Sequence, residues 1–334
     1  MRYHKQTSYE SRKYAPYSRE ASRERARRRA SERRGKIIVS IFALLLILLI
    51  SLFVYISQIA MGHRGAQSVN PLHHITDTIA QTKPQTPIVP MTYETKYGII
   101  NTEDYDYERA RDMGSKDPIL ELQTILQDPS QYPEALLEKI CLNPEALHFV
   151  YEYPSKKGTA PADSIGKPIL VNNKIPLLLQ FDQAWGYDIY GDAELATSGC
   201  GPTVLSMAYC GLTGDTSMTP AKIGDLSEKA GYYTAEGTSW TMMSQGAKKL
   251  GLKSSQIKLG QNNFKKELDK GHIIVCSVKP GDFTQLGHFI LIVGQTKDGL
   301  LMINDPNSLK RSSTLWTYDV VLPQVKAAWS VSKA

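Results

Sequence analysis

A chain of 334 residues with 42% apolar and 22% charged residues has the composition of a globular protein of one or two domains with appendages, not of a disordered chain. The net charge of +6 is unevenly distributed: residues 1–36 contain 13 Lys and Arg against 4 Glu and carry +9, whereas residues 37–334 carry −3. The positive charge is therefore confined to an N-terminal tail and gives no sign of a basic functional surface elsewhere.

The basic tail precedes residues 37–57, a run of 21 residues without a charge. A helix of this length spans about 32 Å, which is enough to cross a bilayer. The basic flank predicts a cytoplasmic tail and an external remainder, and it explains the charge better than nucleic-acid binding does. A cleaved signal peptide is disfavoured, because its apolar part is shorter and residues 57–60 contain no Ala-x-Ala site. We therefore predict an uncleaved signal anchor in the cell membrane and no nucleic-acid partner.

Residues 58–115 are polar, contain four prolines and show no sustained periodicity, which predicts an extended extracellular stalk. Its paired histidines, residues 73–74, lack further ligands at metal-binding spacing, so no metal site is predicted. Residues 116–153 then show apolar positions at helical spacing, with prolines where helices would begin. About three short helices cannot bury a core alone, so we expect this extension to pack on the domain that follows. Residues 154–167 are rich in Lys, Gly and Pro and predict a linker.

The final domain, residues 166–334, mixes strands and helices. Short strands are expected first, helices next and longer strands last, which is the order of an α+β fold with an antiparallel sheet. The expected strands are residues 169–171, 175–179, 273–278, 289–293, 300–303 and 327–331, and the expected helices are residues 201–210, 220–230, 240–250 and 263–270.

The sequence SGCGPT at residues 198–203 places a thiol between two glycines, directly before apolar residues at helical spacing. Cys200 is therefore expected at a helix N-terminus, where unpaired N–H groups and the helix dipole favour the thiolate. Pro202 suits the first turn, and the glycines are expected to let a substrate backbone approach the sulfur. A buried structural cysteine would also fit this pattern. The remaining cysteines match no disulfide framework or zinc motif and are interpreted as buried apolar residues: Cys141, Cys210 and Cys276.

A nucleophilic cysteine needs a base, and the base needs an orienting partner. Of the seven histidines, only His272 and His288 lie in the final domain. His288 opens a predicted hairpin that ends in the carboxylate of Asp305, whereas no comparable carboxylate follows His272. With a two-residue loop, Asp305 would lie about 13 Å from His288 along the strand, but with a four-residue loop, residues 296–299, it becomes a diagonal neighbour at about 7 Å. The catalytic interpretation therefore requires the longer loop.

The negative charge that develops on a carbonyl oxygen under attack needs hydrogen-bond donors. The backbone N–H of Cys200 is one candidate. The side-chain amide of Gln180, at the end of the expected strand 175–179, is the candidate for the second, with Gln183 a weaker one. This set of groups implies neither a metal ion nor an organic cofactor.

The order Gln180, Cys200, His288, Asp305 resembles the papain-like cysteine peptidases, in particular the bacteriocin-leader-processing double-glycine peptidase family and its stand-alone relatives. The resemblance covers about residues 168–329 and rests on PLLLQ at 176–180, CGPT at 200–203, GHF at 287–289 and NDP at 304–306. The segments YPE at 132–134 and NPE at 143–145 are similar to the region that precedes this domain in predicted surface peptidases of Gram-positive bacteria.

The resemblance implies a papain-like fold in which Cys200 is the nucleophile, His288 the base, Asp305 the orienting residue and Gln180 the oxyanion donor. The best-known members of the family are fused to an export transporter and cut leader peptides in the cytoplasm. This chain has one apolar span and no nucleotide-binding loop motif, so leader processing is not expected of it.

The sequence thus predicts a membrane-anchored extracellular cysteine peptidase that acts on peptides or proteins. Two alternatives stay open. The same triad would serve a cell-wall peptide amidase or transferase, and a binding module without catalysis could retain the same fold.

Overall fold

The computed structural model describes residues 86–167, 169–171 and 174–334. The basic tail, the predicted membrane span at residues 37–57 and the first part of the predicted stalk lie outside the described residues. Within the described ranges, no helix combines the length and the apolar character that a membrane crossing requires. The described residues belong to one compact unit.

The described chain begins with elements in the segment that we assigned to the stalk. β1 (Thr92–Thr95) and β2 (Gly98–Asn101) form an antiparallel hairpin, and α3 (Tyr107–Arg111) follows. Gly98 has a φ of 146°, a conformation that suits glycine in this tight connection. Ile100 packs into the core that the next helices share. The prediction of an extended stalk is therefore wrong for residues 92–111, where a short hairpin has too few residues to show a periodicity.

The expected helices of residues 116–153 are confirmed. They are α4 (Pro118–Gln127), α5 (Glu134–Leu142) and α6 (Leu147–Lys156), with the short 3-10 turns Pro129–Gln131 and Pro144–Ala146 between them. α6 continues through Pro154, so the predicted linker begins later than expected. The apolar faces of these helices belong to the same buried cluster as the domain that follows, which confirms the expected packing. We call residues 92–156 the helical extension.

The next part of the chain is mainly helical. Its strands are short: β3 (Ile189–Tyr190), β4 (Ala193–Glu194), β5 (Tyr233–Thr234) and β6 (Gly237–Thr238). Its helices are α7 (Leu195–Ser198), α8 (Cys200–Thr213), α9 (Pro220–Lys229), the π-helix Met242–Gly246, α10 (Ala247–Lys249) and α11 (Gln261–Leu268). α8 ends at Gly214, whose φ of 80° allows its N–H to bond the carbonyl of Cys210 at 2.9 Å.

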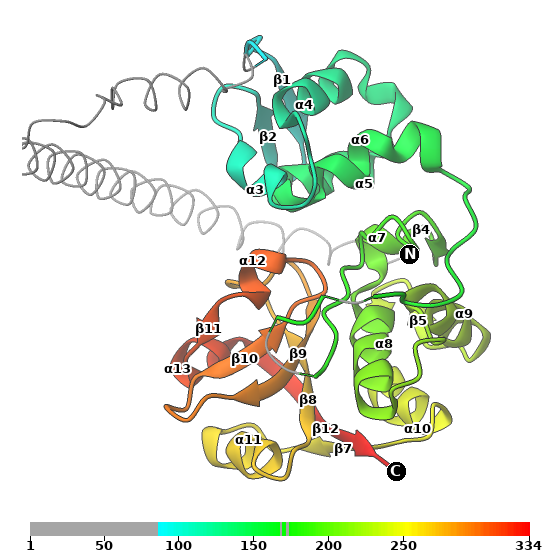
Figure 1. Ribbon diagram of the computed structural model, residues 1–334, viewed down its shortest axis with the longest axis vertical. Helices are drawn as coiled ribbons and strands as arrows, with labels where there is room; N and C mark the ends of the chain where they lie inside the picture. Colours follow the sequence, from blue (N-terminus) through cyan, green and yellow to red (C-terminus); the bar gives the residue numbers. More distant parts are fainter. Residues whose placement is uncertain (1–85, 168, 172–173) are drawn as a thin grey trace, which may run out of the picture. The chain divides into compact units, whose positions relative to one another are not determined.

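An antiparallel sheet of six strands, in the order β11-β10-β9-β8-β12-β7, completes the fold (Figure 1). Its strands are β7 (Leu252–Ile257), β8 (Ile273–Val278), β9 (His288–Gln295), β10 (Leu301–Asn304), β11 (Leu315–Trp316) and β12 (Val325–Lys333). Three short helical turns connect them: α12 (Leu309–Ser312), α13 (Tyr318–Val321) and the 3-10 turn Leu322–Gln324. The predicted order of helices before an antiparallel sheet is confirmed.

The two faces of the sheet are both covered, because alternate side chains of a strand point to opposite faces. In β8, Ile273 and Val275 join the cluster that contains α8, whereas Ile274 and Cys276 join a second cluster that contains Phe264 of α11. Burial on both faces explains why β8 is apolar without interruption and was predicted with its observed bounds. The exposed pattern of β7 gives no such signal, and that strand was missed.

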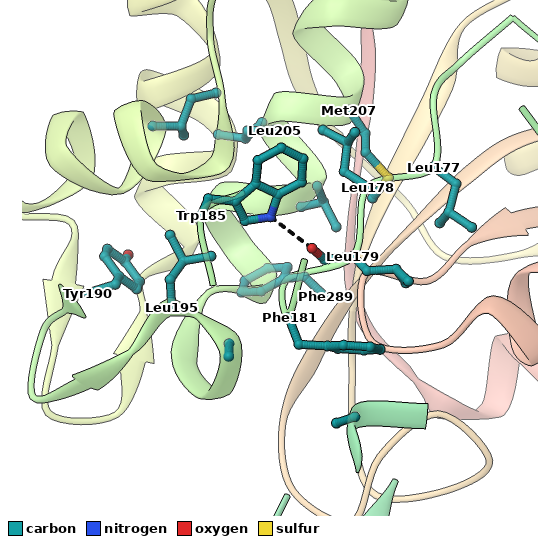
Figure 2. Close-up of a cluster of buried hydrophobic side chains, with 14 of the residues drawn as sticks. Leu177, Leu178, Leu179, Phe181, Trp185, Tyr190, Leu195, Leu205, Met207 and Phe289 are labelled. Carbon is teal, nitrogen blue, oxygen red and sulfur yellow. Dashed lines mark hydrogen bonds between the residues drawn. The ribbon is translucent and has the colours of Figure 1, made fainter. Parts of the chain in front are cut away.

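Residues 175–179 do not form the expected strand; one isolated bridge joins Ile169 and Leu177. Figure 2 shows what these residues do instead: Leu177, Leu178 and Leu179 enter a core beside Trp185, whose indole Nε1 donates to the Leu179 carbonyl at 2.8 Å. This core is contributed by several elements, among them α7, α8 and β9: Leu195, Leu205, Met207 and Phe289. The apolar run is thus explained by the burial of all three leucines, and it holds the residue that follows, Gln180, beside α7.

Candidate active site

Cys200 is the first residue of α8, as predicted. The first backbone bond of this helix runs from the Thr203 N–H to the Gly199 carbonyl at 3.0 Å, so the N–H of Cys200 has no acceptor within the helix. The Cys200 side chain is half-buried and forms no disulfide. A half-buried thiol at the positive end of a 14-residue helix is in an environment that favours the thiolate.

The two glycines beside Cys200 have a different role from the one predicted. A Cβ on Gly199 would lie 2.4 Å from the Leu195 carbonyl oxygen, and a Cβ on Gly201 would lie 2.6 Å from the Thr238 side chain. The space beside both glycines is therefore filled by the protein's own atoms. They allow α7 and the β6 segment to pack closely against the start of α8, and they do not open a path for a substrate backbone.

His288 is the first residue of β9 and pairs with Val278 of β8. Its Nε2 lies 2.8 Å from Oδ1 of Asp305, and both side chains are buried. With Nε2 engaged by the carboxylate, the other ring nitrogen is left for the thiol, and the interaction between the side chains of Cys200 and His288 shifts the pKa of both groups. The structure therefore brings the predicted nucleophile, base and orienting carboxylate together.

The register that brings Asp305 to His288 is reached in an unexpected way. Leu301 pairs with Gln295, so the hairpin loop is residues 296–300 and has neither of the two lengths considered. A bulge between Met302 and Ile303 then shifts the register by one residue, and Asn304 pairs with Leu291. Extended by one residue, this register sets Asp305 opposite Ile290 and makes it a diagonal neighbour of His288, which is the relation that the four-residue loop was expected to give.

The charges of the three groups depend on one another. Burial raises the pKa of the Cys200 thiol, but the hydrogen bond and charge of His288, with the backbone N–H groups of Phe289 and Gly201, outweigh burial and leave the pKa below its ordinary value. Burial lowers the pKa of His288, but the charge and hydrogen bond of Asp305 and the contact with Cys200 raise it to about 9. These opposite directions favour a thiolate–imidazolium pair near neutral pH.

Asp305 is held in its ionised form by two cations. Although burial acts to raise the pKa of this carboxyl group, the charge of Arg311, with that of His288, holds it far below its usual range. The Arg311 Nε donates to Oδ2 of Asp305, the oxygen that does not face His288. Arg311 was missed by the sequence analysis, and an arginine six residues after a candidate acid, in a helical turn, was the signal available for it.

Gln180 joins the segments that carry the other candidates. Its backbone N–H donates to the Pro306 carbonyl at 2.7 Å, next to Asp305. Its side-chain Nε2 donates to the Ala196 carbonyl at 2.7 Å, four residues before Cys200, while its buried Oε1 has no hydrogen-bond partner. The side-chain amide of Gln180 has a second N–H that can donate a hydrogen bond. Gln183, the weaker candidate, is exposed.

The other histidine of this domain has a carboxylate partner after all. His272 Nδ1 lies 2.9 Å from Glu267 Oε2, so the expectation that it lacks one is wrong, because only the residues after it were considered. His272 nevertheless lies at the start of β8, whereas His288 pairs with Val278 at its end. Six residues of extended chain separate these positions by about 20 Å. His288 and His272 therefore differ in their position along β8, not in whether a carboxylate lies beside them.

The remaining cysteines are free, and the prediction that they are buried is confirmed for Cys210 and Cys276 but is wrong for Cys141, which is half-buried at the end of α5. Burial raises the pKa of the Cys210 thiol to about 11. These thiols have no histidine like that of Cys200. No group of three or more His, Cys, Asp and Glu side chains that would hold a metal ion is found among the described residues.

Residues 172–334 match the model of the Peptidase_C39 like family. These residues are thus similar to a family described as peptidase-like, and their mixed helix and sheet architecture fits that similarity. Two solved structures are similar to this chain. The first is the peptidase domain of Streptococcus ComA, which is described as a bi-functional ABC transporter involved in a quorum-sensing pathway, and the second is the peptidase domain of Streptococcus mutans ComA. Their identities are 22% and 21% and their TM-scores 0.34 and 0.27, and each alignment covers 41% of this chain and 93% of that chain. No curated protein matches the chain.

A buried lysine from the helical extension lies beside this candidate site. The Lys139 Nζ donates to Oδ1 of Asn307 at 2.7 Å and lies 4.9 Å from the centre of the Phe181 ring. Phe181 follows Gln180, and Asn307 is two residues after Asp305. Burial, and next the charge of Arg311, lower the pKa of Lys139 to about 7. This contact could not be predicted from local patterns, because it joins residues 168 positions apart.

We expect Lys139→Met to stabilise the protein in a pH-dependent way. In the folded protein Lys139 is protonated only below about pH 7, whereas in the unfolded chain it stays protonated up to the ordinary pKa of lysine. The free-energy cost of burying the charged group is therefore fully present below pH 7 and disappears as the pH rises towards that ordinary pKa. The Tm of the variant should exceed that of the wild type by about 4 °C at pH 6, with a smaller difference at pH 9.

Calorimetry of both proteins at the two pH values checks this expectation. The exposed Lys265 of α11 provides the matched control, Lys265→Met. An equal change of Tm at pH 6 and pH 9 would show that the ammonium group of Lys139 carries no burial cost.

Proposed function

We propose that this protein is a cysteine peptidase in which Cys200 is the nucleophile, His288 the general acid and base, Asp305 the residue that orients His288, and Gln180 an oxyanion donor. The observation that carries the proposal is that the His288 ring is hydrogen-bonded to the Asp305 carboxylate and interacts with the Cys200 thiol, whose pKa it lowers. Most buried cysteines have no such chain of partners, and the family match of residues 172–334 agrees with this chemistry.

The reaction begins when the Cys200 thiolate attacks the carbonyl carbon of a peptide bond. A C–S bond forms and the carbonyl oxygen becomes an oxyanion. The backbone N–H of Cys200 and the second N–H of Gln180 are the donors that we assign to this oxygen. The C–N bond then breaks, and the imidazolium of His288 gives its proton to the leaving amine. Water, deprotonated by the neutral His288, hydrolyses the thioester and regenerates the thiol.

Asp305 supports both proton transfers. Its ionised carboxylate fixes the orientation of the His288 ring and stabilises the positive charge that the ring carries before the amine leaves. Arg311 keeps this carboxylate ionised by occupying its second oxygen. All of these steps use protein side chains and water, and the proposal includes no metal or organic cofactor.

The location is also a proposal, and it rests on the sequence. The uncharged residues 37–57 and the basic residues before them support a single membrane span with the N-terminus in the cytoplasm and the peptidase outside, on the surface of a Gram-positive bacterium. Externally added trypsin should then remove residues 86–334 from intact cells and leave the N-terminal tail protected. A protein that stays intact in unbroken cells would contradict this orientation.

The experiment that tests the function compares the wild-type protein with Cys200→Ala on two substrates: casein-derived peptides and purified cell wall. We expect new peptide termini from casein with the wild type alone. Release of cell-wall peptides, or their transfer to an amine, would instead support the amidase or transferase alternative. If neither substrate changes and Cys200 is inert towards thiol reagents, the domain is a binding module and the proposal is wrong.

A further inference from the structure

Asp305 belongs to a turn that the protein holds from several sides. The N–H of Asn307 donates to Oδ1 of Asp305 at 2.7 Å, and the N–H of Ser308 donates to the Asp305 carbonyl at 3.1 Å. The same Oδ1 faces His288. The position of the orienting carboxylate therefore depends on where residues 307–309, the turn that leads into α12, are fixed.

The helical extension binds this turn through one buried carboxylate. Oε1 of Glu145 accepts from the Ser308 hydroxyl at 2.6 Å, and Oε2 accepts from the Leu309 N–H at 2.6 Å. Asn143 adds a third bond, from its Nδ2 to the Asn307 carbonyl at 2.7 Å. The Glu145 side chain is only 1% exposed, so water cannot replace these bonds. Three successive residues of the turn are thus held by two side chains from a segment more than 160 positions earlier.

The charge of Glu145 is itself balanced within the extension. Arg109 of α3 donates to Oε1 of Glu145 through its Nε at 3.1 Å and one Nη at 2.8 Å, and that Nη also donates to Asn143 at 3.0 Å. Pro144 begins the 3-10 turn that Asn143 caps by accepting the Glu145 N–H at 3.2 Å. The sequence NPE at 143–145 therefore places two polar side chains rigidly at the turn that carries Asp305.

We infer that Glu145 is a positioning residue for the reaction proposed above, acting from the helical extension through residues 307–309 to hold the Asp305 carboxylate against His288. The inference rests on the proposed function. It gives the helical extension a part in the active site, which the peptidase family match, beginning at residue 172, does not include. Lys139, bonded to Asn307, lies in the same contact.

The test is Glu145→Gln in the full chain, with Glu121→Gln as the matched control. Glu121 is also a buried carboxylate of the extension, but its partner is His148 and it has no contact with the turn. Glutamine cannot accept from the Leu309 N–H and the Ser308 hydroxyl while also binding Arg109 as a carboxylate does. We expect Glu145→Gln to lower kcat on a cleaved casein peptide about tenfold with little change in KM, as is typical when the partner of an orienting group is removed.

A readout on pH separates positioning from mere stability. A displaced Asp305 holds the proton on His288 less tightly, so the alkaline limb of the kcat/KM profile should move to lower pH in Glu145→Gln and stay in place in Glu121→Gln. If the two variants have the same kcat and the same profile, the inference is wrong. If Glu145→Gln does not fold, the double variant Arg109→Gln/Glu145→Gln removes both charges of the pair, and wild-type kcat in that variant would overturn the inference.

Failure of this inference can be told from failure of the proposed function. The rate at which iodoacetamide alkylates Cys200, followed by peptide mass spectrometry, needs no substrate. If wild-type Cys200 reacts no faster than free cysteine, the proposed function fails. If wild-type Cys200 is fast and Glu145→Gln has the same pH profile of alkylation, Glu145 alone loses its role.

Discussion

Replacing Cys200 by alanine is expected to abolish peptidase activity, with a loss of at least about 10⁴-fold in kcat, because neither His288 nor Asp305 can replace the thiol that forms the acyl intermediate. The fold should be unaffected. Cys200 is only half-buried, and alanine is compatible with the first turn of α8. The measurement is the rate of product formation under single-turnover conditions, together with the thermal unfolding curve.

The other cysteines provide the controls for this prediction. Cys141→Ala changes a half-buried thiol at the end of α5, and Cys210→Ala changes a buried thiol near the end of α8. Both variants should retain kcat within about twofold even if Cys210→Ala loses some stability through the small cavity that it leaves. Loss of activity in Cys141→Ala, with activity kept in Cys200→Ala, would refute the assignment of the nucleophile.

The substitution Asp305→Asn is expected to lower kcat about 10³- to 10⁴-fold, since loss of the orienting carboxylate allows the wrong tautomer of the histidine. In the wild type the carboxylate raises the pKa of His288 to about 9. The sign for stability follows from this: the stabilising effect of protonated His288 is fully present at acidic pH and is lost as the pH rises towards 9. In Asp305→Asn the pKa of His288 should fall, which nuclear magnetic resonance of the imidazole protons measures directly.

Burial of Asp305 between two cations requires a further control. Asparagine leaves Arg311 without its carboxylate, which alone destabilises a protein by about 3–5 kcal/mol. The double variant Asp305→Asn/Arg311→Met removes both members of the pair and should recover most of this stability, but not the activity. Asp298→Asn, in the exposed tip of the same hairpin, should be neutral. Full activity in the folded double variant would show that Asp305 has no part in the reaction.

Local patterns in the sequence were sufficient where a residue's environment is set by its neighbours in the chain. The helix at Cys200 follows from apolar spacing and Pro202, and β8 follows from an apolar run buried on both faces. The approach of Asp305 to His288 followed from register arithmetic, although the path differed: a bulge at Met302 and Ile303 compensates for a longer loop. No local sequence pattern indicates a bulge of this kind, so only the final pairing of the two strands could be predicted.

The parts of the site that were missed are set by contacts between distant segments. Glu145 and Lys139 reach the turn after Asp305 from more than 160 residues away, and no periodicity or spacing records such a pair. The glycines at 199 and 201 were given a role towards a substrate because the side chains that fill their surroundings, Leu195 and Thr238, were not visible from the sequence. The hairpin at residues 92–101 was overlooked because two four-residue strands cannot be told from a polar linker by composition.

The proposed reaction requires the Cys200 thiol to be ionised by its contact with His288, and the pH dependence of Cys200 alkylation reports this ionisation. Peptide mass spectrometry after timed exposure to iodoacetamide gives the rate for each cysteine between pH 5 and pH 10. We expect Cys200 to react at pH 6 at least about tenfold faster than a free cysteine, whose thiol is almost fully protonated there, while Cys210 and Cys276 stay unmodified in the folded protein. A Cys200 that reacts no faster than free cysteine, with a rate that rises only near the ordinary thiol pKa, would show that His288 does not ionise this thiol.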